Sequence, residues 1–194
     1  MRLRLALLGV ALVVAGCGSG PKAAAPTTTA AAPASAGFVL QQPVPSPPFR
    51  LRDQAGRVVG PQLYRGHWTV VTFLYTNCPD VCPLIANQLA AAQRTNRDLR
   101  VIAVSVDPRN DTPAAIRRFL ARHHTGPRFR YVAGARAALR PVWSSYHIAA
   151  LPGPSGTVSH SAISLLLDPR GRERVLFDSR VTAREVLAAV RRLA

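Results

Sequence analysis

The chain has 194 residues and a formal net charge of +16, from 25 basic and 9 acidic residues. Apolar residues make up 48% of it, so a buried core can form without the disulfide framework of a small secreted domain. All basic residues except Lys22 are arginines, and they are spread along the chain rather than clustered. We therefore attribute the charge to biased composition and expect no nucleic-acid partner.

Residues 1–16 have the pattern of a lipoprotein signal peptide. Arg2 and Arg4 precede an uncharged apolar run over residues 5–15, which is too short to span a bilayer. The run ends in the sequence Val-Ala-Gly-Cys, which resembles the lipobox of bacterial lipoproteins. This resemblance implies that Cys17 is acylated and anchors the protein at the extracytoplasmic face of the cell membrane. The alternative is an ordinary secretory signal with a chance cysteine.

Residues 17–48 are predicted to form a disordered tether. The segment is rich in Ala, Pro and Thr, and it contains seven prolines and almost no large apolar residue before Phe38. Such a composition cannot bury enough apolar surface to fold, so we expect a semi-extended spacer between the membrane and a single domain over residues 49–194.

From residue 49 onward, strand patterns alternate with helix patterns. In chain order we expect a β-hairpin (49–52 with 58–59), a buried strand (68–75), a helix (82–94), a second buried strand (101–106), a helix from 113, a short strand (129–133), a helix (139–146), a Gly/Pro loop (150–156), two strands (163–167 and 174–177) and a closing helix from 182. This order predicts an α/β fold: a thioredoxin-like three-layer sandwich with a central mixed sheet and an N-terminal β-hairpin.

The segment Tyr-Thr-Asn-Cys-Pro-Asp-Val-Cys-Pro, residues 75–83, carries the candidate chemistry. It lies between the first buried strand and the following helix, so Cys78 is expected at the carboxyl end of a strand, where ligands gather in open α/β sheets. The partial positive charge of a helix start favours thiolates, and the spacing brings Cys78 and Cys82 to one side of the helix. The pair is a disulfide, a redox couple or a metal site.

A histidine would complete a metal site. Two thiolates and one imidazole suit three-coordinate Cu(I), whereas zinc usually takes a fourth ligand. His160 stands just before the 163–167 strand, near the position where thioredoxin-like proteins place a proline that faces the cysteines. We therefore select it over the other four histidines, for which we expect structural or solvated roles: His67, His123, His124 and His147.

Two acidic residues lie close to these candidates in the sequence. Asp80, inside the cysteine loop, either caps the helix or contacts a partner protein. Asp107 either forms the turn before Pro108 or orients a metal ligand from behind.

Three separated motifs carry a family resemblance: Cys-Pro-Asp-Val-Cys-Pro at 78–83, Ser-Val-Asp-Pro at 105–108 with Asp-Thr-Pro at 111–113, and His-Ser at 160–161 before Leu-Asp-Pro-Arg-Gly at 167–171. Together they resemble the Sco/SenC family over residues 49–194. The resemblance implies that Cys78, Cys82 and His160 bind copper as Cu(I) or Cu(II).

The resemblance also implies a metallochaperone that delivers copper to the binuclear copper centre of cytochrome c oxidase subunit II, or to another exported cuproprotein. The alternative is an extracytoplasmic thiol–disulfide oxidoreductase, in which Cys78 and Cys82 are the redox pair and reduce the cysteines of that centre or of another exported protein. A purely structural Cys78–Cys82 disulfide is a third interpretation, disfavoured because so short a loop contributes little stability.

Overall fold

The computed structural model describes residues 37–153 and 157–194. The predicted signal peptide, Cys17 and most of the predicted tether lie outside these residues. Within them, no helix has both the length and the apolar character needed to cross a membrane.

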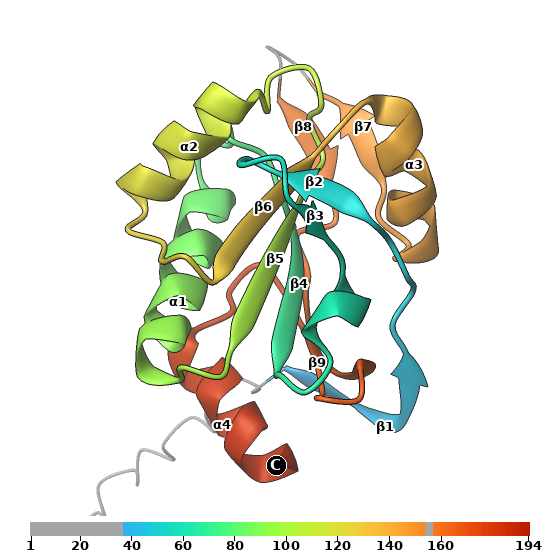
Figure 1. The fold of residues 1–194 in the computed structure, drawn as a ribbon, viewed down its shortest axis with the longest axis vertical. Coiled ribbons are helices and arrows are strands. Elements are labelled where there is room, and N and C mark those ends of the chain that lie inside the picture. Colours follow the sequence, from blue (N-terminus) through green and yellow to red (C-terminus); the bar gives the residue numbers. More distant parts are fainter. Residues whose placement is uncertain (1–36, 154–156) are drawn as a thin grey trace, which may run out of the picture. The chain divides into compact units, whose positions relative to one another are not determined.

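An eight-stranded mixed sheet forms the centre of the domain, with the strand order β1-β10-β9-β4-β5-β6-β2-β3 (Figure 1). Only the neighbours β4, β5 and β6 pair in parallel, and the other pairs are antiparallel. The central strand β4 is buried along its whole length, as its run of β-branched residues predicts. The strands are β1 (Phe38–Pro45), β2 (Leu51–Asp53), β3 (Val58–Val59), β4 (Thr69–Leu74), β5 (Arg100–Ser105), β6 (Phe129–Ala133), β9 (Ser164–Leu167) and β10 (Arg172–Phe177).

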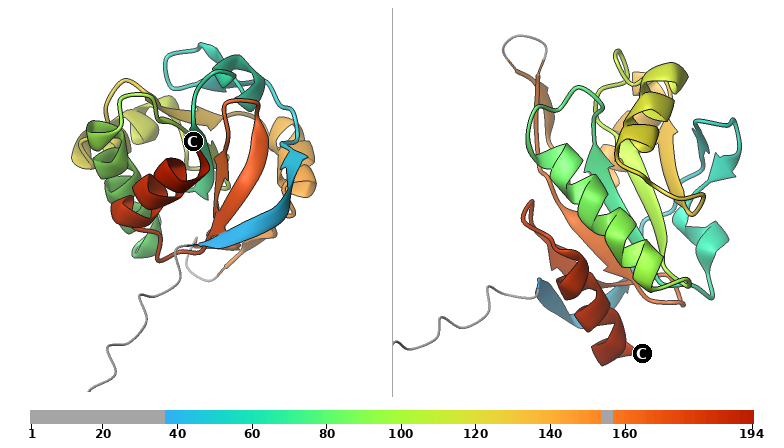
Figure 2. Two further views of the ribbon diagram at one scale, coloured as in Figure 1. Left: turned by 90° about the horizontal axis from the view of Figure 1, so that it is seen from below. Right: turned by 90° about the vertical axis from the view of Figure 1, so that its left-hand side faces the viewer.

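Helices cover both faces of the sheet, so the domain has three layers (Figures 1 and 2). Right-handed β4-α1-β5 and β5-α2-β6 crossovers place α1 (Val81–Thr95) and α2 (Pro113–Arg122) on the same face. Helix α4 (Ala183–Leu193) packs beside α1 on that face, and α3 (Arg136–Ser145) covers the opposite one. A short 3-10 helix, η1 (Pro61–Tyr64), precedes β4. The predicted thioredoxin-like sandwich is confirmed, and the β2–β3 hairpin pairs as expected.

Strand β1 corrects the predicted end of the tether. Residues 38–45 are not a spacer but an edge strand that pairs antiparallel with β10, with Phe38 opposite Leu176 and Val44 opposite Glu173. The register shifts between Val39 and Val44, so the strand is bulged there. An edge strand tolerates prolines because its outer edge donates no ladder hydrogen bonds. For that reason the proline-containing sequence of residues 38–45 did not indicate a strand.

The predicted Gly/Pro loop at 150–156 is also corrected. Its first part forms β7 (Ala150–Pro152), which pairs antiparallel with β8 (Val158–His160) as a separate two-stranded sheet. Each strand has only three residues, so no alternating pattern could develop in the sequence. The hairpin brings His160 to the end of β8.

Candidate metal centre

Cys78 and Cys82 lie where β4 gives way to α1. The backbone N–H of Cys78 donates to the Tyr75 carbonyl at 3.3 Å, which closes a tight turn after the strand. Cys82 is in the first turn of α1, and its backbone N–H donates to the sulfur of Cys78 at 3.3 Å. Both side chains are buried as free thiols. Cys78 thus follows the carboxyl end of β4, as predicted, and Cys82 lies at the start of α1.

The two thiols differ in acidity. A hydrogen bond from the Cys82 thiol, together with the N–H groups of Asp80 and Cys82, outweighs burial and lowers the pKa of Cys78 to about 6. The same shared hydrogen bond and burial raise the pKa of Cys82. At neutral pH the pair therefore holds one thiolate, on Cys78, and one thiol, on Cys82.

His160 faces the cysteines from the β7–β8 hairpin. Its Nε2 atom lies 4.0 Å from the Cys82 sulfur, and its ring packs edge-on against Tyr75 with 5.7 Å between centroids. The Nδ1 atom is buried without a hydrogen-bond partner among the described residues. Burial lowers the pKa of His160, so at pH 7 the imidazole is neutral and has a free lone pair.

A pocket of about 280 Å³ exposes this group to solvent. Cys78 and His160 both line it, together with Tyr75 and Asp80, while Cys82 lies fully buried beneath. Within residues 37–153 and 157–194, no three His, Cys, Asp or Glu side chains are already arranged to hold a metal ion. The structure thus brings the three predicted residues together without closing them into a coordination site.

Asp111 belongs to a motif of the family resemblance, but the sequence alone indicates no role for it at the site. Its carboxylate is buried and accepts hydrogen bonds from the backbone N–H and hydroxyl of Thr76 at 2.8 and 2.7 Å. It also accepts from Ser105 at 2.6 Å and from the Tyr131 hydroxyl at 2.9 Å. The carboxylate ties β5 and β6 to the loop that carries Cys78, so it fixes the position of that loop.

Asp80 and Asp107 both make local hydrogen bonds. Asp80 is the N-cap of α1, where its carboxylate accepts from the Val81 N–H, and the Cys78 sulfur lies 3.5 Å from that carboxylate. Asp107 is buried in the turn after β5 and accepts from the Asn110 side chain at 2.7 Å. Asp80 therefore both caps α1 and contacts Cys78. The hydrogen bonds of Asp107 are those of a turn.

The remaining histidines lie elsewhere. His67 pairs with Asp98, and His123 hydrogen-bonds to Asn87 on α1. His124 and His147 both follow helix ends in the left-handed backbone region. In the part of the chain that the structure describes, none of these four rings forms a hydrogen bond with Cys78 or Cys82.

Comparison with known proteins identifies the family. The SCO1/SenC family model matches residues 40–194, which includes most of β1. The SCO2-like protein RP587 of Rickettsia prowazekii is 27% identical over 150 residues, or 72% of each chain. Among solved structures, Bradyrhizobium japonicum ScoI with copper bound is 32% identical, with a TM-score of 0.64 over 78% of this chain and 100% of that one. Apo Sco1 from Thermus thermophilus is 27% identical, with a TM-score of 0.70 over 82% and 96%. The chain belongs to the SCO1/SenC family.

Proposed function

We propose that this protein binds one copper ion through Cys78, Cys82 and His160 and passes it to the binuclear copper centre of cytochrome c oxidase subunit II or to another exported cuproprotein. Copper is then a cargo rather than a permanent cofactor. The copper-bound ScoI of Bradyrhizobium japonicum supports the choice of metal, because this chain shares its fold at 32% identity.

The observation that carries the proposal is the 4.0 Å separation between His160 Nε2 and the Cys82 sulfur. A metal with bonds of about 2.0 Å to nitrogen and about 2.3 Å to sulfur holds those two ligands about 3.6 Å apart. A movement of a few tenths of an ångström would therefore let both atoms share one ion. The neutral imidazole and the Cys78 thiolate also offer their lone pairs at pH 7.

Transfer needs a site that an acceptor can reach. Cys78 and His160 line the solvent-facing pocket, so an incoming ligand from a partner protein can replace either of them in turn. Cys82 lies beneath and would hold the ion during the exchange. Soft sulfur ligands favour Cu(I) over the harder cations, which suits selective delivery.

We place this chemistry at the extracytoplasmic face of the cell membrane. The signal pattern of residues 1–16 and the candidate acylation site Cys17 support a lipid anchor. The remaining Ala/Pro/Thr-rich segment, now ending at β1, would act as the spacer between anchor and domain.

A second candidate function, thiol–disulfide exchange, is favoured by the opposite pKa shifts of the two cysteines. The Cys78 thiolate would attack a partner disulfide and form a mixed disulfide, releasing one partner thiolate. Cys82 would lose its proton and attack Cys78, which releases the second partner thiol and leaves a Cys78–Cys82 disulfide. The partner gains two electrons and the protein loses two.

Copper titration of the reduced chain tests the first proposal. We expect one copper per chain, with an absorption band for bound Cu(II). His160→Ala should abolish that band and still allow a Cys78–Cys82 disulfide, whereas His124→Ala, an exposed change away from the site, should retain it. Full copper affinity in His160→Ala would refute the ligand assignment. Rapid reduction of a model disulfide by that variant would support thiol exchange.

A further inference from the structure

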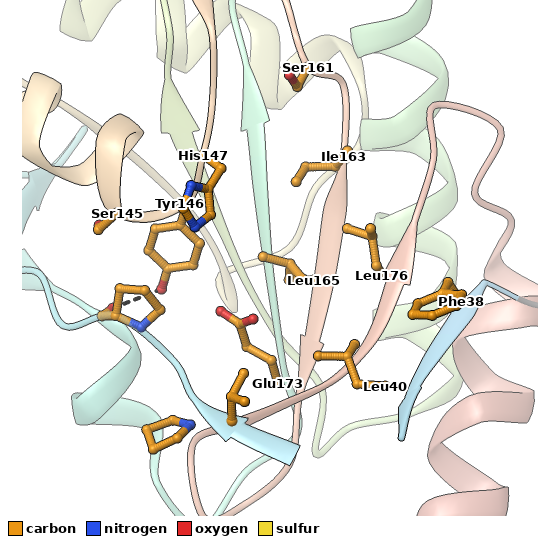
Figure 3. Close-up of a pocket in the computed structure, with 13 residues that line it drawn as sticks. Phe38, Leu40, Ser145, Tyr146, His147, Ser161, Ile163, Leu165, Glu173 and Leu176 are labelled. Atoms are coloured by element: carbon orange, nitrogen blue, oxygen red, sulfur yellow. Dashed lines mark hydrogen bonds between the residues drawn. The ribbon is translucent and has the colours of Figure 1, made fainter. Parts of the chain in front are cut away.

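A second and larger pocket lies on the face of the sheet that α3 covers. Its volume is about 540 Å³, within the range of small-molecule sites, and it shares no lining residue with the pocket of Cys78 and His160. Side chains of β1, β9, β10 and the end of α3 surround it (Figure 3). Most of its wall is apolar and includes Phe38, Leu40, Ile163, Leu165 and Leu176.

Glu173 is the acidic residue among those that line this pocket. Its side chain projects from β10 into the pocket among these apolar groups (Figure 3). The residue is half-buried, and no described residue donates a hydrogen bond to its carboxylate or forms a salt bridge with it. Partial burial removes some of the water around this carboxylate, and no described side chain replaces that water with a hydrogen bond, so a cation in the pocket would find an unpaired acceptor.

The other titratable groups of the wall do not fill that role. The Tyr146 hydroxyl is already bonded to the Ser46 side chain at 2.6 Å and donates to the Pro47 carbonyl at 2.9 Å. His147 follows α3 and is exposed. Burial raises the pKa of Glu173, and the smaller electrostatic influence of His147 does not cancel that rise. Among the described residues, no lysine or arginine lines the pocket.

We propose that this pocket binds a small organic cation, a protonated primary amine joined to an apolar body. The ammonium group would pair with the Glu173 carboxylate, and the apolar body would contact Leu165 and Leu176. A neutral apolar molecule would leave the carboxylate unpaired, and an anion would be repelled by it. The chain carries a net charge of +16, so a cation has no general electrostatic reason to bind, and its retention would report on this site.

Titration of the purified, methyl-labelled chain at pH 7 with benzylamine tests the proposal, with benzyl alcohol as a neutral ligand of similar size. We expect benzylamine to cause saturable shifts of the Leu165 and Leu176 methyl resonances. Benzyl alcohol should bind at least about tenfold more weakly, because a hydrogen-bonded ion pair in a partly buried site is worth roughly that factor.

The matched variants are Glu173→Gln and Asp178→Asn, which change the net charge equally. Asp178 is an exposed residue just after β10 and is ion-paired with Arg180. Glu173→Gln should remove the preference for the amine, and Asp178→Asn should keep it. Equal binding of the two ligands to the unmodified chain, or an amine preference that survives Glu173→Gln, would overturn the proposal. The first comparison needs no variant, so it stands even if Glu173→Gln folds poorly.

Discussion

The carboxylate of Asp111 provides a stringent test of how the cysteine loop is held. It accepts four hydrogen bonds, two from Thr76 and one each from Ser105 and Tyr131. Three separate segments of the chain therefore meet at one buried group. Replacing Asp111 by alanine removes all four acceptor interactions at once.

The loss in the free energy of unfolding depends on the hydrogen-bond donors that Asp111→Ala leaves without an acceptor. Each buried donor without a partner costs about 1–3 kcal/mol. The hydroxyls of Ser105 and Tyr131 can rotate toward water that enters the vacated space, whereas the Thr76 backbone N–H cannot turn. Burial also raises the pKa of Asp111, so removal of the carboxylate recovers part of its desolvation cost. We therefore expect Asp111→Ala to lower the free energy of unfolding by about 3–4 kcal/mol, a large share of the typical total of about 5–15 kcal/mol.

Urea unfolding of the reduced chain, followed by circular dichroism, measures this loss. The control is Asp98→Ala, which removes the carboxylate of the exposed His67–Asp98 pair and should cost less than about 1 kcal/mol. If Asp111→Ala is destabilised by no more than this control, the carboxylate does not hold the loop and our reasoning is wrong.

Two further predictions concern acidity. In the metal-free reduced protein, the rate of Cys78 alkylation by iodoacetamide should rise with pH, with a midpoint near pH 6, while Cys82 stays unmodified. The reason is that the pKa values of the two thiols shift in opposite directions. Equal modification of the two cysteines, measured by mass spectrometry, would contradict this. Burial raises the pKa of Asp168, but hydrogen bonds from the backbone and side chain of Arg172 outweigh it and leave the pKa below its ordinary value. Its stabilising effect should therefore be complete above about pH 4 and be lost as the pH falls through the lower folded-state pKa. Urea unfolding between pH 3 and 7 measures this effect in an Asp168→Asn variant. At pH 7 the variant should be less stable than the unmodified chain by about 1 kcal/mol, and its stability should fall less as the pH is lowered. If the stability of the two proteins falls in parallel with pH, the Asp168 carboxylate does not contribute the acid-sensitive stability.

The central strands and helices could be predicted because their sequence patterns are local and strong. Residues 68–75 are a near-continuous run of β-branched, aromatic and other apolar residues, and the observed β4 is buried throughout. The capping box at Thr182 and Glu185 forms as the sequence indicates and starts α4. Once these elements are known, the right-handed crossover rule places α1 and α2 on the same face of the β4–β5–β6 part of the sheet.

The two incorrect predictions, a spacer over residues 38–45 and a loop over residues 150–156, have a common cause. Strand β1 and the β7–β8 hairpin are both short or proline-containing, and both depend on partners rather than on their own pattern. Strand β1 forms because β10 presents an open edge, a fact that no local window of residues 38–45 contains. Placing β1 in the sheet also brings Phe38 and Leu40 into the wall of the pocket around Glu173.

The candidate site also contains residues that the sequence indicates and one whose role it does not indicate. Cys78, Cys82 and His160 could be selected from residue type and position, because few residues have soft donors and these lie next to recognisable elements. The role of Asp111 could not be predicted, since its bonds reach Thr76, Ser105 and Tyr131, up to 35 positions away in the chain. Only the packed fold shows that these donors converge.

The site therefore consists of two parts with different structural support. The cysteines are held by the start of α1 and by the bonds of Asp111 to their loop, and both supports belong to the main sheet and its helix layer. His160 comes from a hairpin whose strands pair only with each other. Thiol–disulfide exchange would require the first part alone, whereas the proposed copper binding through all three residues would require both. We therefore expect a change confined to the hairpin to remove the proposed metal binding and leave the dithiol chemistry in place, so the two proposed functions are physically separable.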